Sequence, residues 1–283
     1  MGTTDDTNAS APTNRRPRAS ELVAFAWGDI ELTTAGSGPA VVVLHRDLGP
    51  IGCAELVDLL AADHRVIQIS LPGFGRSSLP SWTRSVAHLA ALIGRVIDGC
   101  APAATVVGLG FGGWVAAELV ATSPARVGAL ALVSPMGVRP RVGEVVDQFL
   151  FSPLRYAALA AGGDDQRDRL LAELPADQVD EFLDRSREAV TRVAWKPIGH
   201  DPALIGLLPG LRVRAAVVWG SDDRIVPPST AAQWAALFAT ERVEFVDGAP
   251  HIVEFTHPSV VANTVASLER APARPLDRIP GVA

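Results

Sequence analysis

Cysteine is scarce in this chain of 283 residues, which holds only Cys53 and Cys100. The two residues lie far apart, and neither belongs to a C-x-x-C pair or to another metal-ligand spacing. This pattern excludes a disulfide framework and a cysteine-based metal site. Two isolated thiols are typical of a protein in a reducing compartment, so we predict a cytoplasmic location and no bound metal.

An excess of positive charge is also missing, because 25 Lys and Arg residues stand against 31 Asp and Glu residues, for a formal net charge of −6. A nucleic-acid-binding protein needs a basic stripe that neutralises phosphates. The composition therefore argues against a nucleic-acid partner. Hydrophobic residues make up 48% of the chain, which supplies enough apolar material for a buried core.

No segment is predicted to enter a membrane. Residues 1–20 lack the apolar core of a signal peptide and are predicted to form a disordered tail. The most apolar stretch, residues 105–121, contains four glycines toward its start and Glu118 near its end. Glycines and a carboxylate at these positions favour a strand, a turn and a helix over a membrane span.

Short apolar runs alternate with stretches of helical periodicity along most of the chain. Residues 40–44 (AVVVL) are apolar without interruption, which is typical of a strand covered on both faces. We predict strands at residues 22–27, 30–34, 40–44, 65–70, 104–107, 129–133, 215–219 and 243–246, and helices at 86–98, 114–121, 230–238 and 260–268. This alternation predicts an α/β fold with a mostly parallel twisted sheet flanked by helices.

The alternation stops in the middle of the chain, where Asp, Arg and Leu recur with helical spacing. We predict that residues 21–138 and 201–271 form the α/β core, that 139–200 form an inserted helical cap, and that 272–283 form a loose tail. One large domain with an insertion fits a length of 283 residues.

Four sequence motifs bear on the chemistry. GLGFGG (residues 108–113) follows a predicted strand and opens a helical stretch. It lacks the Lys-Ser/Thr of a phosphate-binding loop and comes too late in the chain for a dinucleotide fingerprint. The other motifs are HR (45–46) and LPGFGRS (71–77), each at the end of a predicted strand, and the pair GSDD (220–223) and GAPH (248–251). Together the four motifs resemble the α/β-hydrolase superfamily over residues 22–270.

The resemblance implies an active site. In the superfamily a GxSxG turn carries the nucleophilic serine, and a catalytic Asp and His follow later in the chain. The matching residues here are Gly110 at the nucleophile position, Asp223 and His251. The backbone N–H groups of Phe111 and Arg46 match the oxyanion hole. The chain departs from the pattern at the predicted site twice, with Gly110 in place of the serine and Arg46 in place of a glycine, and Ser70 replaces an Asp in the loop after residues 65–70.

Arg46 admits two interpretations. We expect its side chain to point to solvent or to pair with Asp47, as most exposed charges do. The alternative is that the guanidinium binds an anionic group of a substrate, for which its planar fork is suited.

The substrate is predicted to be a small, largely apolar molecule held between the sheet and the cap. The residues predicted to contact it are His45, Trp114, Phe149, Phe151 and Trp195. The alternative is that the aromatic residues belong to the core, which we expect for Trp114. No motif implies a metal, nucleotide or flavin, so no cofactor is expected, and the sequence does not indicate an oligomeric state.

Three functions stay open because residue 110 has no hydroxyl group. In the first, which the retained Asp223 and His251 favour, His251 acts as a general base on an ester, lactone or carbonyl compound without a covalent serine intermediate. In the second, the protein is an inactive pseudo-hydrolase that binds a small molecule or a partner. In the third, it is a serine esterase with an engineered Ser-to-Gly change.

Overall fold

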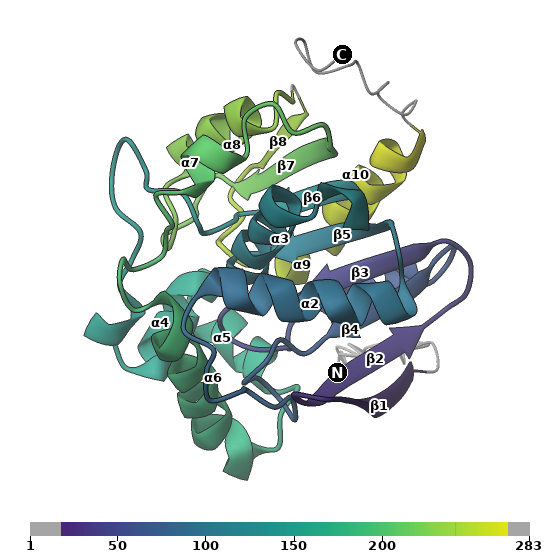
Figure 1. The fold of residues 1–283 in the computed structure, drawn as a ribbon. Helices are drawn as coiled ribbons and strands as arrows, with labels where there is room; N and C mark the ends of the chain where they lie inside the picture. The colour runs from purple at the N-terminus through teal and green to yellow at the C-terminus, as the bar shows by residue number, and fades with distance from the viewer. Residues whose placement is uncertain (1–17, 241, 271–283) are drawn as a thin grey trace, which may run out of the picture.

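The computed structural model describes residues 18–240 and 242–270, which contain one eight-stranded sheet (Figure 1). The strands are β1 (Arg18–Phe25), β2 (Gly28–Ala35), β3 (Ala40–Leu44), β4 (Arg65–Ile69), β5 (Ala104–Leu109), β6 (Val127–Val133), β7 (Arg214–Gly220) and β8 (Val243–Val246). Their order in the sheet is β1-β2-β4-β3-β5-β6-β7-β8. Strand β2 pairs antiparallel with β1 and β4, and all other neighbours pair parallel. The predicted α/β fold with a mostly parallel sheet is confirmed.

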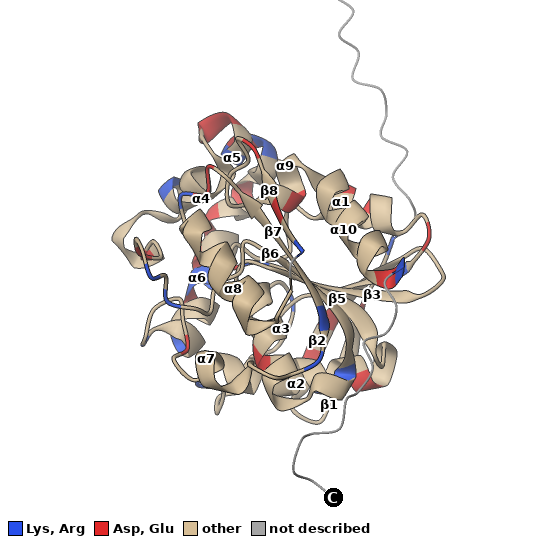
Figure 2. Cartoon of the chain, turned by 90° about the horizontal axis from the view of Figure 1, so that it is seen from above, with Lys and Arg blue, Asp and Glu red and all other residues tan. Residues whose placement is uncertain are grey.

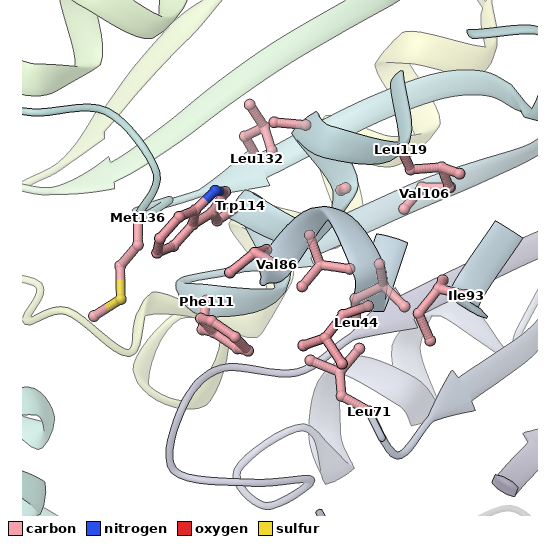
Figure 3. Close-up of a cluster of buried hydrophobic side chains, with 14 of the residues drawn as sticks. Leu44, Leu71, Val86, Ile93, Val106, Phe111, Trp114, Leu119, Leu132 and Met136 are labelled. Carbon is pink, nitrogen blue, oxygen red and sulfur yellow. The ribbon is translucent and has the colours of Figure 1, made fainter. Parts of the chain in front are cut away.

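Helices cover both faces of the sheet. One face carries α2 (Val86–Cys100), α3 (Phe111–Thr122) and α8 (Ala231–Leu237), and the other carries α1 (Ala54–Leu60), α9 (Val253–Thr256) and α10 (Pro258–Arg270). In β3, Val42 and Leu44 belong to the core on the α2–α3 side, whereas Val41 and Val43 belong to the other core. Because alternate residues of a strand point to opposite faces, a strand between two cores is apolar throughout. Figure 3 shows part of the core on the α2–α3 side.

A group of helices lies between β6 and β7. It comprises α4 (Pro153–Ala161), α5 (Asp164–Leu171), α6 (Val179–Ala194) and α7 (Leu204–Leu207). Helix α4 packs against α5 and α6, and Figure 1 shows these three at one end of the sheet. Ser152 caps α4 by accepting from the N–H of Arg155, and Gly162 ends it with a φ of +88°. Acidic and basic positions occur side by side on α5 (Figure 2). The predicted cap, residues 139–200, contains α4 to α6.

The N-terminal boundary differs from the prediction. Strand β1 begins at Arg18, so residues 18–20, predicted as part of the disordered tail, belong to the sheet. The Arg18 side chain pairs with Asp58 at 2.9 Å and donates to the carbonyl of Ala54 at 2.6 Å. The start of this strand was not predicted because most of the residues of β1 are exposed, so the apolar pattern of a core strand is absent. The rest of the predicted tails lies outside the described residues.

The apolar stretch 105–121 forms most of β5 and α3, as predicted. Helix α3, however, begins at Phe111 and not at residue 114. Glycine is unfavourable in the interior of a helix, so Gly112 and Gly113 led to a predicted start that omits the first turn. A Cβ atom on Gly112 would lie 2.2 Å from the carbonyl oxygen of Leu44, so a glycine is needed where α3 approaches β3. In the described ranges, no helix has both the length and the apolar character of a membrane span.

Candidate active site

The turn between β5 and α3 is built around Gly110. Its φ angle is +50° and its ψ angle is −111°, a conformation that L side chains rarely adopt. The Gly110 carbonyl accepts from the N–H groups of Gly113, Trp114 and Met136, and its own N–H donates to Val133 at 2.9 Å. Hydrogen bonds to both the N–H and the carbonyl of Gly110 therefore fix the turn at the end of β5, a central strand.

Asp223 follows β7, His251 follows β8, and their side chains are hydrogen-bonded. Nδ1 of His251 lies 2.8 Å from Oδ2 of Asp223. The other carboxylate oxygen accepts from the backbone N–H groups of Ile225 at 2.8 Å and Val226 at 2.9 Å. Because a carboxylate only accepts, Nδ1 of His251 carries the proton, and Nε2 of the neutral ring is left as a hydrogen-bond acceptor.

Three loops meet beside Gly110. A Cβ atom on Gly110 would lie 3.3 Å from Nε2 of His251 and 2.8 Å from Nη1 of Arg46. The exposed fraction is 0% for His251 and 1% for Arg46. Within residues 18–240 and 242–270, neither Nε2 of His251 nor Nη1 of Arg46 has a hydrogen-bond partner, and we call these two atoms the open acceptor and the open donor. The structure thus brings Gly110, Asp223 and His251 together and adds the Arg46 side chain.

The expectation for Arg46 is wrong, because its side chain neither points to solvent nor pairs with Asp47. Its Nε and Nη2 atoms lie 2.5 Å from the two carboxylate oxygens of Glu254 in a buried, two-pronged ion pair. An isolated buried charge costs several kcal/mol, so Glu254 is what allows Arg46 to be buried. Glu254 was not predicted as a site residue. It stands three residues after His251, but 208 positions separate it from Arg46, and no local pattern links the two.

Asp47 bonds instead to Tyr156 in α4. The Tyr156 hydroxyl donates to Oδ2 of Asp47 at 2.5 Å, and both residues are buried. Burial, and then the adjacent Asp47 carboxylate, raise the pKa of Tyr156 well above its ordinary value, so the phenol stays protonated and acts as the donor. This hydrogen bond joins the predicted cap to the loop that carries Arg46. Tyr156 is the only tyrosine of the chain, and no motif marked it as a site residue.

His45 was predicted to bind substrate, but both of its ring nitrogens are engaged within the protein. Nδ1 lies 2.6 Å from the carbonyl of Arg46, and Nε2 accepts from the N–H of Leu71 at 2.9 Å. Burial lowers the pKa of His45 to about 4, so the ring is neutral near neutral pH. Its polar atoms hold the loop after β3 in place, which leaves no ring nitrogen for a substrate.

Phe111 and Trp114 are core residues in α3 (Figure 3). Their ring centroids lie 6.1 Å apart, and Nε1 of Trp114 donates to Glu118 at 3.0 Å. The structure therefore matches the expectation that Trp114 belongs to the core. The backbone N–H of Phe111, predicted for the oxyanion hole, is that of the first residue of α3, directly after Gly110.

Phe149 and Trp195 contact each other, and Phe151 contacts the core. The rings of Phe149 and Trp195 lie 5.3 Å apart, and the Arg187 guanidinium lies 5.1 Å from the Phe149 centroid. Trp195 is 55% exposed and lines a cavity of about 700 Å³ that does not include His251 among its lining residues. Phe151 packs at the margin of the core on the α2–α3 side. His251 itself is fully buried, so the site that the sequence predicted around it is not open to solvent in this conformation.

Cysteine chemistry has no role in the described site. Cys53 is buried and Cys100 is half-buried, and both are free thiols. Burial raises the pKa of each thiol, which makes both poor nucleophiles near neutral pH. In the part of the chain that the structure describes, no group of three or more His, Cys, Asp or Glu side chains is placed to hold a metal ion.

Comparison with known proteins finds relatives that include enzymes of more than one kind. The polyketide synthase ThaQ of Burkholderia thailandensis is 31% identical over 267 residues, which cover 86% of this chain but only 12% of ThaQ. That match therefore concerns one region of a much longer polypeptide. The pimeloyl-[acyl-carrier protein] methyl ester esterase of Aeromonas salmonicida is 29% identical over 248 residues, which cover 79% of this chain and 92% of the esterase.

The fold is shared with solved hydrolase structures. The serine hydrolase CCSP0084 of Cycloclasticus zankles superimposes with a TM-score of 0.73 at 16% identity, over 89% of this chain and 98% of that one. The sequence model of the alpha/beta hydrolase family matches residues 41–264, which is most of the chain. This match shows that the chain belongs to the alpha/beta hydrolase family.

Proposed function

We propose that the protein is an enzyme that acts on a small, largely apolar ester, lactone or carbonyl compound without forming a covalent serine intermediate. Gly110 stands at the nucleophile position of the family pattern, and glycine has no atom that could attack a carbonyl carbon. His251, oriented by Asp223, serves as the general base on water or on an acidic proton of the substrate. Relatives that are named as an esterase and as hydrolases support this class of reaction.

The observation that carries the proposal is the position of the open acceptor. Nε2 of His251 lies 3.3 Å from the Cβ position of Gly110, so it faces the place where a reacting atom would approach the turn. The hydrogen bond to Asp223, at 2.8 Å, fixes the tautomer that presents a lone pair there. A positioned base of this kind contributes about 10²–10⁴-fold to a reaction rate.

The start of helix α3 supplies the second part of the proposed chemistry. The first N–H groups of a helix lack partners within the helix and carry partial positive charge. Phe111 is the first residue of α3 and directly follows Gly110. We therefore assign the backbone N–H groups of Phe111 and Arg46 to the stabilisation of negative charge on a carbonyl oxygen.

A binding protein without turnover is the second candidate function, and one observation favours it. The Arg46 side chain fills the space beside Gly110, and His251 has an exposed fraction of 0%, so solvent does not reach the base in this conformation. A site that stays closed holds a ligand or a partner without converting it. A single engineered Ser-to-Gly change is less well supported, because a side chain at position 110 would meet Arg46 at 2.8 Å.

Turnover of a substrate panel tests the enzyme proposal. The native protein, His251→Ala and His88→Ala would be assayed on short-chain and aromatic esters, lactones and carbonyl compounds. His88 is an exposed histidine outside the cluster and serves as the matched control. We expect turnover by the native protein and His88→Ala, and a loss of about 10²-fold or more in His251→Ala. Full activity in His251→Ala would reject the general base, and ligand binding without turnover would favour the second candidate.

Reinstating the family residues tests whether the site is assembled. The triple variant Arg46→Gly/Gly110→Ser/Glu254→Gln restores both residues of the family pattern without leaving a buried carboxylate unpaired, and we expect it to hydrolyse esters and to react with a serine-directed phosphonate at position 110. Gly110→Ser alone should stay inactive, since Nη1 of Arg46 lies 2.8 Å from the new Cβ atom. The native protein should not be labelled. Labelling at another serine, such as the buried Ser134, would reveal a different nucleophile.

A further inference from the structure

We infer that Arg46, held by Glu254, binds the ligand of this site, and that the ligand presents a hydroxyl or enol oxygen to Arg46 and His251 together. The inference rests on the proposed function, because both use His251 as the base. It adds a second functional side chain and names a substrate class, namely compounds with an acidic O–H group such as enols and phenols.

The open donor is what remains of the guanidinium after it binds Glu254. A guanidinium has five N–H bonds in a planar fork, and the Nε and Nη2 edge of Arg46 faces Glu254 at 2.5 Å. The Nη1 group lies toward Gly110, where it meets no acceptor from residues 18–240 or 242–270. Leaving a buried donor unpaired costs about 1–3 kcal/mol, and more for a charged group. A ligand that supplies the missing acceptor removes this cost.

The open acceptor restricts the ligand further. Nη1 of Arg46 only donates, and Nε2 of His251 only accepts when the ring carries a single proton, on Nδ1. Both atoms face the same side of Gly110, because they lie 2.8 Å and 3.3 Å from its Cβ position. One oxygen that satisfies both must accept one hydrogen bond and donate another. A hydroxyl group does both, whereas a carboxylate, ether or ketone oxygen only accepts. A water oxygen also accepts and donates, so the experiment below uses a probe that water cannot imitate.

The charges of the cluster favour a neutral ligand over an anion. Arg46 is one cation beside the buried carboxylates of Glu254, Asp47 and Asp223, so an anionic ligand would add to an excess of negative charge. A hydroxyl compound enters uncharged. When its proton moves to His251, the O–H bond breaks, the electron pair stays on oxygen, and an N–H bond forms at Nε2. The oxyanion then faces Arg46 and the imidazolium faces Asp223, so each new charge forms beside a partner.

Helix α4 contacts the residues beside this cluster, and we assign it the control of access to the cluster. The hydroxyl of Tyr156 in α4 donates to Asp47 at 2.5 Å, and the carbonyl of Ala160 in α4 accepts from the N–H of Ile252 at 3.3 Å. The residues that α4 contacts, Asp47 and Ile252, directly follow Arg46 and His251 in the sequence. Because His251 has an exposed fraction of 0%, a ligand reaches its Nε2 atom only when α4 moves away from the core.

The experiment uses 4-nitrophenol as the probe. Its neutral and ionised forms absorb at different wavelengths, so the bound molecule reports its own protonation state. The native protein would be titrated with 4-nitrophenol across a range of pH. We expect the bound probe to be ionised at a pH where the free probe is mostly neutral, with its ionisation equilibrium shifted about tenfold or more.

Three variants assign the effect to residues. Arg46→Gln/Glu254→Gln removes both charges of the buried pair, which preserves folding better than removal of one, and we expect it to abolish the shift in ionisation. His251→Asn should bind the probe only in its neutral form. Arg126→Gln is the matched control, because Arg126 pairs with Asp98 at the surface, and it should behave as the native protein does. Thermal unfolding verifies that each variant is folded.

The outcomes separate this inference from the proposed function. Nitrophenol that does not bind, binds only in its neutral form, or ionises equally in the Arg46→Gln/Glu254→Gln variant would overturn the inference. None of these results affects the proposed function, which depends on the loss of turnover in His251→Ala. Ionised binding that requires Arg46, together with full turnover by His251→Ala, would keep the ligand assignment and reject the general base.

Discussion

The Arg46 guanidinium lies 2.8 Å from the place that a Cβ atom on Gly110 would take. These are two of the positions at which the sequence comparison with the α/β-hydrolase pattern predicts a departure, from a glycine at position 46 and from a serine at position 110. The Arg46 side chain therefore lies beside the place that a side chain at position 110 would occupy. The two departures act as one structural change, and variants at either position must be interpreted together.

The first prediction concerns this shared space. Gly110→Ala should lower the free energy of unfolding by about 2–5 kcal/mol, because a left-handed φ disfavours a Cβ atom and the new methyl group would press on Arg46. In the Arg46→Gly/Glu254→Gln background the contact with Arg46 is gone, and the backbone strain and the 3.3 Å contact with Nε2 of His251 remain, so the loss should fall to about 1–2 kcal/mol. Urea unfolding measures both values.

Gly99→Ala is the control for this comparison. No described atom lies within 4 Å of a Cβ built on Gly99, so the substitution should change stability by less than about 1 kcal/mol. An equal loss for Gly110→Ala in both backgrounds would show that Arg46 does not occupy the space beside Gly110.

The second prediction concerns the buried ion pair. Glu254→Gln leaves the buried Arg46 cation without its counter-charge and should lower the free energy of unfolding by about 3–5 kcal/mol. Asp98→Asn breaks the surface pair with Arg126 and should cost less than about 1 kcal/mol. Chemical denaturation of both variants gives the comparison. Similar losses would mean that Arg46 is solvated and not held by Glu254.

Local patterns were enough to predict the sheet, and the family resemblance predicted the position of the candidate site. Each of the eight predicted strands has a counterpart in the structure, and 40–44 matches β3 (Ala40–Leu44) to the residue. Buried strands are continuous apolar runs, and the residues directly after them lie at one edge of a parallel sheet. The resemblance to the α/β-hydrolase superfamily then grouped Gly110, Asp223 and His251 before any coordinates were known.

The partners of Arg46 and Asp47 could not be predicted in this way. The pairing of Arg46 with Glu254 spans 208 positions, and that of Asp47 with Tyr156 spans 109. Both depend on how loops and α4 pack over the sheet edge, and neither leaves a periodic pattern in the sequence. The expectation for Arg46 was wrong because it treated the side chain as an isolated exposed charge. In the folded protein the buried carboxylate of Glu254 pairs with it.

The third prediction concerns the cover over the site. Tyr156→Phe removes the donor to the buried Asp47 and should lower the free energy of unfolding by about 1–3 kcal/mol. It should also loosen α4, so that His251 becomes accessible to diethyl pyrocarbonate, a reagent that modifies neutral imidazoles. Mass spectrometry of the modified peptides measures this. The exposed His88 should react equally in both proteins and serves as the internal control. Continued protection of His251 in Tyr156→Phe would show that α4 does not control access.

The last prediction concerns pH and the carboxyl group of Glu118 in α3. Burial raises the pKa of Glu118 from 4.5 to about 7. The hydrogen bond from Trp114 lowers this pKa, and the neighbouring Asp201 carboxyl raises it further. Below pH 4.5 both the folded and the unfolded state hold the proton, so the group has no effect on stability. Between pH 4.5 and about 7 only the folded state keeps it, so the free energy of unfolding falls as pH rises through this window, by at most about 3 kcal/mol.

Glu118→Gln removes this ionisation and still accepts from Trp114. The stability of Glu118→Gln relative to the native protein should therefore rise between pH 4.5 and pH 8, by up to about 3 kcal/mol. Urea unfolding at several pH values measures the trend. Glu181→Gln, on the exposed side of α6, is the control and should show a difference that varies by less than about 0.5 kcal/mol. A difference for Glu118→Gln that is constant with pH would mean that Glu118 ionises in the folded protein as readily as in the unfolded chain.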